Sequence, residues 1–92
     1  MALTYKIVKF ETDESDSTKT MVGFDITDSD TGRTLAVDGS TTTGSKTDSQ
    51  ICTAAQASVQ SSIDAWVARI VNLGKTWNPD SSSIEWQKNN NL

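Results

Sequence analysis

The feature that most constrains the fold of this chain is the run of residues 49–73, which has the periodicity of one long helix. Apolar side chains recur along one side of it at helical spacing, namely Ile51, Ala55, Val59, Ile63, Trp66, Val67, Ile70 and Leu73. A stripe of this kind packs against a sheet or another helix. We therefore predict a single amphipathic helix, capped by Asp48 or Ser49 and ended by Gly74 in a left-handed conformation.

The segments before this helix predict three strands. Side chains alternate between apolar and polar in residues 3–10, 20–27 and 33–38, with Val22, Phe24 and Ile26 on one face of the second segment. Polar residues 11–19 and the turn-forming residues 28–32 separate the strands, and residues 39–47 are predicted as a flexible crossover to the helix. Short connections favour an antiparallel meander. The predicted fold is α+β: a three-stranded antiparallel meander packed against one long C-terminal helix, with an extended C-terminal arm.

The opposite side of the helix carries small residues at steps of three and four: Ala54, Ala57, Ser61, Ala65 and Ala68. Small side chains at this spacing allow another backbone to approach closely, so this face is a candidate partner-binding surface. Alanine also favours helix on an exposed face without any partner. Both interpretations stay open. A single helix over residues 49–73 would be about 37 Å long, longer than a compact chain of this size, which is roughly 30 Å across.

The residues after Gly74 contain aromatic side chains in polar surroundings. A turn at residues 78–80, where proline prevents a helix, separates Trp77 from Ile84 and Trp86. Tryptophan is enriched at interface hot spots, so we predict that these three residues bind a partner. The alternative is that the tryptophans fold back as a lid over the protein's own sheet. We divide the chain into a single α+β domain at 1–75 and an arm at 76–92.

Composition narrows the classes of function. Histidine is absent, which removes the commonest general base and the commonest metal ligand. The chain has a single cysteine, Cys52, and a net charge of −4 with no basic stripe, which disfavours binding to phosphate backbones. Its apolar runs are too short to span a membrane. We therefore expect no enzyme activity, no cofactor, no metal, no nucleic acid and no membrane association.

Two segments resemble ligand-binding motifs, but neither has the residue spacing that its motif requires. Residues 74–76 read Gly-Lys-Thr, but a phosphate-binding loop needs a glycine where Arg69 stands. Residues 28–32 resemble the start of a calcium loop, yet the required glycine and glutamate positions hold Arg33 and Gly39. The acidic residues Asp13, Glu14 and Asp16 lie in a flexible polar loop, which holds catalytic or cation-binding groups poorly.

The chain resembles small virion proteins of tailed bacteriophages, particularly T7-like phages of marine cyanobacteria. The likeness rests on residues 28–33, on Ala65-Trp66 late in the helix, and on residues 74–80 after it. It implies a capsid decoration or cement subunit, or a head–tail or tail accessory subunit. Such a subunit would reside in the virion and contact capsid, portal or tail proteins and copies of itself. The likeness implies no catalytic residue.

Two other hypotheses stay open from the sequence. An acidic inhibitor that mimics nucleic acid against a host enzyme would use residues 11–16 together with Asp25, Asp28 and Asp30, and it requires these carboxylates on one contiguous face. A hydrolase that uses acidic residues would instead require a concave pocket with two close carboxylates.

Overall fold

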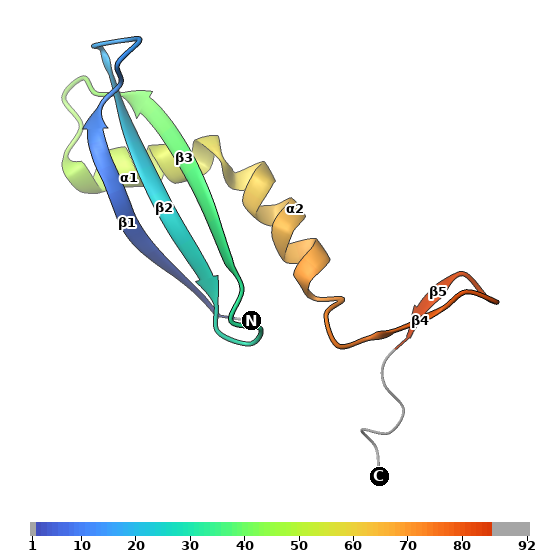
Figure 1. Ribbon diagram of the computed structural model, residues 1–92. Coiled ribbons are helices and arrows are strands. Elements are labelled where there is room, and N and C mark those ends of the chain that lie inside the picture. The colour runs from blue at the N-terminus through green and yellow to red at the C-terminus, as the bar shows by residue number, and fades with distance from the viewer. Residues whose placement is uncertain (1, 86–92) are drawn as a thin grey trace.

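The computed structural model describes residues 2–85, and its first three strands form one antiparallel sheet (Figure 1). The strand order is β1-β2-β3, so consecutive strands are neighbours and the predicted meander is confirmed. The strands are longer than predicted: β1 Leu3–Thr12, β2 Lys19–Asp28 and β3 Thr34–Thr42. Residues 39–42, predicted as crossover, continue β3 because their backbones pair with residues 19–22 of β2.

Two helices cover one face of this sheet and form the core with it. The helices are α1 Asp48–Ser58 and α2 Gln60–Ile70. The buried core comes from alternate residues of β2 and from the predicted helical stripe: Val22, Phe24, Ile26, Ile51, Ala55 and Ile63. Trp66 and Val67 pack against it while half-buried. The stripe is therefore confirmed as the core-facing side, apart from Leu73, which lies past the end of α2 and is 48% exposed.

The predicted single helix is not confirmed, because the chain breaks at Val59 (φ −117°, ψ 11°) and changes direction between α1 and α2 (Figure 1). The cause lies in Ser58. Its Oγ donates to the Ala55 carbonyl at 2.6 Å, and the Val59 N–H bonds the Gln56 carbonyl at 3.1 Å. A serine hydroxyl bonding back to the preceding turn is a known cause of helix bends.

A close approach of β3 to α1 fixes the position of this break. The Ser40 N–H donates to Ser58 Oγ at 3.2 Å, which ties the strand to the end of α1. A Cβ added at Gly39 would overlap the Ala55 carbonyl oxygen, so only glycine allows this crossing. The crossing of β3 over α1 and the helix break therefore involve the same four residues, Gly39, Ser40, Ala55 and Ser58.

Strand β1 contains a β-bulge at Val8. The register shifts between Ile7, opposite Phe24, and Lys9, opposite Gly23. The extra residue moves Phe10 onto the helix-facing side of the sheet, opposite Val22, whereas simple alternation places it on the other side with Val8. Helix α1 packs mainly on β3 and less on β2, so Ile7 and Phe10 of the edge strand β1 are left 51% and 40% exposed.

The ends of the helices also differ in detail from the prediction. The N-cap is Thr47 rather than Asp48 or Ser49: its Oγ1 accepts from the Gln50 N–H at 3.2 Å, and its own N–H donates to Gln50 Oε1 at 2.9 Å. This reciprocal pair is a capping box. Gly74 has the predicted positive φ of 88°, but it ends a turn that follows α2 and not the helix itself.

Beyond this turn the chain forms a small separate hairpin. Strands β4 Thr76–Asn78 and β5 Ser83–Glu85 pair with each other and not with the larger sheet. The described part of the predicted arm is thus a hairpin, which projects away from the sheet and helices (Figure 1). The molecule measures 56 × 24 × 17 Å, and its radius of gyration of 17.8 Å exceeds the roughly 12 Å of a compact chain this long.

Candidate functional site

The hairpin of β4 and β5 is built by side chains that organise its turn. Asn78 Oδ1 accepts from the N–H groups of Asp80 at 3.0 Å and Ser81 at 3.4 Å, and Pro79 presets the first turn residue. Ser82 completes the loop with a φ of 52°. The short polar residues of this segment, which give no strand signal themselves, therefore position the strands on either side.

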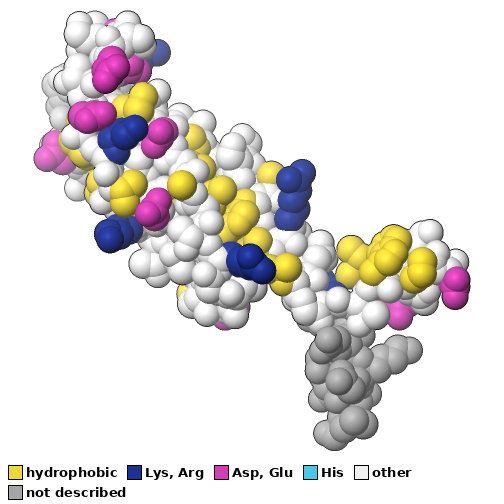
Figure 2. Space-filling view, in the orientation of Figure 1, with side chains coloured by type: hydrophobic (Ala, Val, Ile, Leu, Met, Phe, Trp, Pro, Cys, Tyr) yellow, Lys and Arg dark blue, Asp and Glu magenta, His cyan; other side chains and the backbone are white. Residues whose placement is uncertain are grey.

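The two faces of the hairpin differ in character. On one face, Glu85 Oε2 accepts from Asn78 at 3.3 Å and from Ser83 at 3.1 Å, so polar groups satisfy one another. On the other face, Trp77 and Ile84 are directly opposite each other in the strand register. Trp77 is 58% exposed and Ile84 is 50% exposed, and apolar side chains gather on this side of the hairpin (Figure 2). The structure thus displays a cross-strand apolar pair to solvent.

The isolation of the hairpin makes this exposure informative. A two-stranded hairpin alone is marginally stable in water, and strands of three residues each are shorter than usual. The free energy of this apolar pair is lower when another surface covers it than when water surrounds it. Within the described residues, Trp77 does not act as a lid over the protein's own core, and the lid interpretation is not supported for this side chain. Trp86 lies outside the described residues.

The small-residue face of the helices remains on the outside of the molecule. Ala57, Ser61, Ala65 and Ala68 are exposed, and Ala54 is half-buried. The break at Val59 divides this face into an α1 part and an α2 part that point along different axes (Figure 1). Ala54 and Ala57 line a shallow groove of about 310 Å³ with Ser49, Gln50 and Thr53. No single straight partner helix can therefore follow the whole face.

The acidic residues do not form one surface. Asp13 and Asp16 lie in the β1–β2 loop, and Asp28 begins the β2–β3 turn at the other end of β2. The ten residues of β2 separate the two sites by about 30 Å. Asp28 is fully buried and accepts from the Thr31 Oγ1–H at 2.7 Å, so it is used in its own turn. Asp25 lies on β2 between these sites and is opposite the basic Lys6 of β1 in the strand register. The described part of the chain therefore lacks the contiguous acidic face that a nucleic-acid mimic needs.

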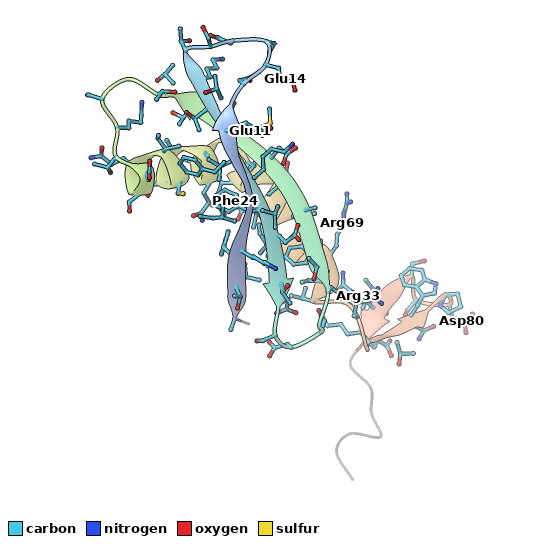
Figure 3. All side chains as sticks on the ribbon, turned by 60° about the vertical axis from the view of Figure 1, so that its left-hand side comes forward. Glu11, Glu14, Phe24, Arg33, Arg69 and Asp80 are labelled. Atoms are coloured by element: carbon cyan, nitrogen blue, oxygen red, sulfur yellow. The ribbon has the colours of Figure 1, made fainter. Side chains whose placement is uncertain are left out.

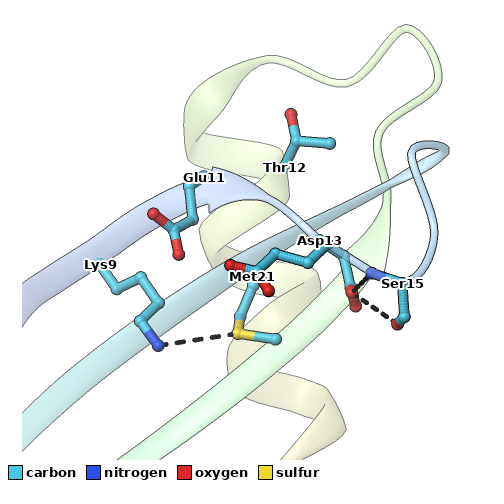
Figure 4. Close-up of a pocket in the computed structure, with 7 residues that line it drawn as sticks. Lys9, Glu11, Thr12, Asp13, Ser15 and Met21 are labelled. Atoms are coloured by element: carbon cyan, nitrogen blue, oxygen red, sulfur yellow. Dashed lines mark hydrogen bonds between the residues drawn. The ribbon is translucent and has the colours of Figure 1, made fainter.

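A concave site does lie beside the acidic loop (Figure 4). It has a volume of about 360 Å³ and is lined by Lys9, Glu11, Thr12, Asp13, Glu14, Ser15 and Met21. The Asp13 carboxylate accepts from the Ser15 hydroxyl and N–H, both at 2.8 Å. These hydrogen bonds lower the pKa of Asp13, whereas a general acid near neutral pH needs a raised pKa. This geometry favours a loop-stabilising role for Asp13.

Two residues that the sequence analysis did not single out as binding residues are Arg33 and Arg69, which line a common groove with Trp66 and Ile70. The sequence does distinguish Arg69, because it is the one basic residue between Thr47 and Leu73. Nothing in the sequence indicates that Arg33, far away in the chain, lies beside it.

Neither α1 nor α2 has the length and apolar character needed to cross a bilayer. Among residues 2–85, histidine, cysteine and acidic side chains form no cluster of three or more suited to a metal ion. Comparisons with protein-family models, curated proteins and solved structures gave no match to this chain.

Proposed function

We propose that this chain is a non-enzymatic assembly protein of a tailed-bacteriophage virion. It would serve as a capsid decoration or cement subunit, or as a head–tail or tail accessory subunit, acting through protein–protein contacts. The observation that carries this proposal is the projecting hairpin with its exposed Trp77–Ile84 pair. The sequence resemblance to small virion proteins is the reason for proposing a phage particle as the assembly.

The structure of the hairpin supports a docking role in a specific way. Large exposed apolar side chains, with a satisfied polar face behind them, are the form that interface anchors take. The hairpin projects from the body of the molecule, where a neighbouring subunit can reach it from several sides (Figure 1). A subunit of 10.0 kDa with a small core also gains stability when a partner covers such surface.

Mass spectrometry of purified phage particles, with copy number, tests the proposal directly. We expect this protein in the particles at a copy number that matches the symmetry of a capsid or tail element. Its presence in infected cells together with its absence from the particles would overturn the proposal.

A matched pair of variants tests the role of the hairpin. Trp77→Ser is expected to reduce incorporation into particles roughly tenfold, the effect of truncating an interface hot spot. Val8→Ser removes an apolar side chain that is 51% exposed on β1, and it should leave incorporation unchanged. Equal incorporation of both variants would show that the hairpin is not the docking element.

A further inference from the structure

A groove near the base of the hairpin combines apolar and positively charged side chains. We name it the arginine groove; its volume is about 430 Å³ and its lining residues are Arg33, Thr34, Trp66, Arg69, Ile70 and Leu73. Arg33 follows the β2–β3 turn, and the others apart from Thr34 come from the C-terminal half of α2 and the turn after it. Figure 3 shows both arginines on the hairpin's side of the molecule.

The charge of this groove is unusual for the chain. The protein has a net charge of −4, yet the arginine groove has two guanidinium groups and no acidic lining residue. Within the described part of the chain neither guanidinium forms an ion pair. The groove is therefore an apolar surface with two cations that lack acidic partners, and its best occupant is an apolar group with an acid beside it.

The hairpin has this chemistry. Residues 76–85 include two acids, Asp80 and Glu85, and no basic residue. Asp80 lies at the tip of the hairpin (Figure 3), beyond the Trp77–Ile84 pair. An indole and an isoleucine side chain entering the groove would bring this carboxylate toward the arginines, and arginine binds carboxylates with two parallel hydrogen bonds.

Charge also distinguishes this groove from the other apolar grooves. A groove of about 520 Å³ between Ile7, Phe10 and Cys52 includes the acidic Asp48, which would repel Asp80. The groove beside Ala54 and Ala57 has no charged lining residue. Of these three, the arginine groove alone complements the hairpin in both apolar character and charge.

The hairpin of the same chain does not occupy its own groove. Leu73 lines the groove, and Gly74, with its φ of 88°, turns the chain away immediately afterwards. We propose that the hairpin of one copy docks into the arginine groove of a second copy. The proposal rests on the assembly function proposed above and names one partner for the hairpin.

This contact joins two different surfaces, so it is head-to-tail. Head-to-tail contacts close into a ring or continue as a filament, and each molecule contributes one hairpin and one groove. The contact area of a single small hairpin is at the low end for specific complexes. Association should therefore be weak and concentration-dependent for a pair and stronger once several contacts form together.

The test is a charge exchange, measured by light scattering and sedimentation of the full chain over a concentration series. The wild type is expected to exceed its monomer mass of 10.0 kDa as concentration rises. Arg33→Glu with Arg69→Glu, and separately Asp80→Lys, should each remain monomeric because both place like charges together. An equal mixture of these two variants should associate again, because every groove then meets a hairpin of opposite charge.

Controls separate this contact from general electrostatics and from misfolding. Lys6→Glu changes an exposed charge on β1, away from the groove, and should associate like the wild type. Trp77→Ser should be monomeric with an unchanged circular dichroism melt. Association that persists in each charge variant measured alone, or a mixture of the two that stays monomeric, would overturn the proposal.

The test also distinguishes failure of this contact from failure of the assembly function. A wild-type protein that is monomeric throughout the series but present in phage particles would overturn self-docking and leave the assembly function standing. Equally, self-association through the arginine groove in a protein that is absent from particles would uphold the contact and overturn the virion function.

Discussion

At the scale of single residues, Asp28 shows how a buried carboxylate can define a turn. It is fully buried, and it accepts from Thr31 Oγ1 at 2.7 Å and from the Thr31 N–H at 3.0 Å. The hydroxyl of Thr31 is the largest cause of a pKa below the ordinary value of 3.8. The charged form is therefore the one that the turn stabilises.

The sign of this shift predicts how stability depends on pH. A carboxylate whose pKa is lowered by folding stabilises the protein above its ordinary pKa of 3.8, and this stabilisation is lost as the pH falls through the lower, folded pKa. Asp13 and Asp16 have the same direction of shift. We expect the melting temperature to fall on acidification below about pH 4, and Asp28→Asn to weaken this dependence. An Asp28→Asn protein with the wild-type pH profile would contradict the prediction.

Gly39 has the closest neighbouring atom of the five glycines. Gly39→Ala places a Cβ against the Ala55 carbonyl, a backbone atom that cannot move alone. We expect a loss of about 3 kcal/mol or more in the free energy of unfolding, measured by urea denaturation. The control is Gly23→Ala, whose Cβ meets chiefly the end of the exposed Asp38 side chain and should cost less.

At the scale of elements, the bulge in β1 shifts the pairing register of an edge strand between Ile7 and Lys9. Deleting Val8 would join Ile7 directly to Lys9 and restore regular pairing, with Phe10 still facing the helices. We expect the deletion variant to fold with a similar far-ultraviolet circular dichroism spectrum. Because bulges protect exposed strand edges from pairing with other chains, it should aggregate faster at high concentration. An unchanged aggregation rate, measured by turbidity, would count against a protective role.

How much of these elements the sequence predicts depends on the range of the interactions that form them. The strands and the core-facing stripe follow from periodicity, which depends on neighbouring residues, and all of Val22, Phe24 and Ile26 are buried as predicted. The break at Val59 depends on Ser58 meeting Ser40, a residue eighteen positions away. The local sequence pattern therefore does not predict this contact between Ser58 and Ser40.

In the candidate site, too, the sequence predicts the features that depend on neighbouring residues and not those that depend on distant ones. The turn at Asn78 and the apolar residues beside it are visible in the sequence, and the hairpin then places Trp77 opposite Ile84. The predicted cap at Asp48 or Ser49 is wrong: Thr47, Asp48 and Ser49 are all good caps, but only Thr47 has a glutamine three residues later, Gln50, to complete a capping box. The arginine groove could not be predicted, because Arg33 and Arg69 meet only in the folded chain.

At the scale of the whole molecule, stability is unevenly distributed. The buried residues belong to β2, to Gly39 of β3, to α1 and to α2, whereas β4 and β5 contain none. Local openings of low free energy occur where few apolar contacts protect the backbone. The molecule therefore joins a cooperative body to an appendage that can open by itself.

This distribution predicts a gradient in amide hydrogen exchange. Amides of Val22, Phe24 and Ile26 should exchange slowest, with a free energy of opening close to that of global unfolding. Amides of residues 76–85 should exchange fastest among the paired residues of the isolated protein, and a bound partner should slow them. Equal protection of hairpin and sheet in the monomer would show that the hairpin packs on the body.

The crossing of β3 over α1 has a consequence for how this protein can evolve. Gly39, Ala55 and Ser58 occupy one point of contact, so a change at any of them is accepted only together with a change at the others. Divergent descendants should keep a glycine in the third strand and, sixteen residues later, an Ala-x-x-Ser segment, even where their surfaces have drifted. That spaced pattern offers a means of recognising kinship when overall identity has been lost.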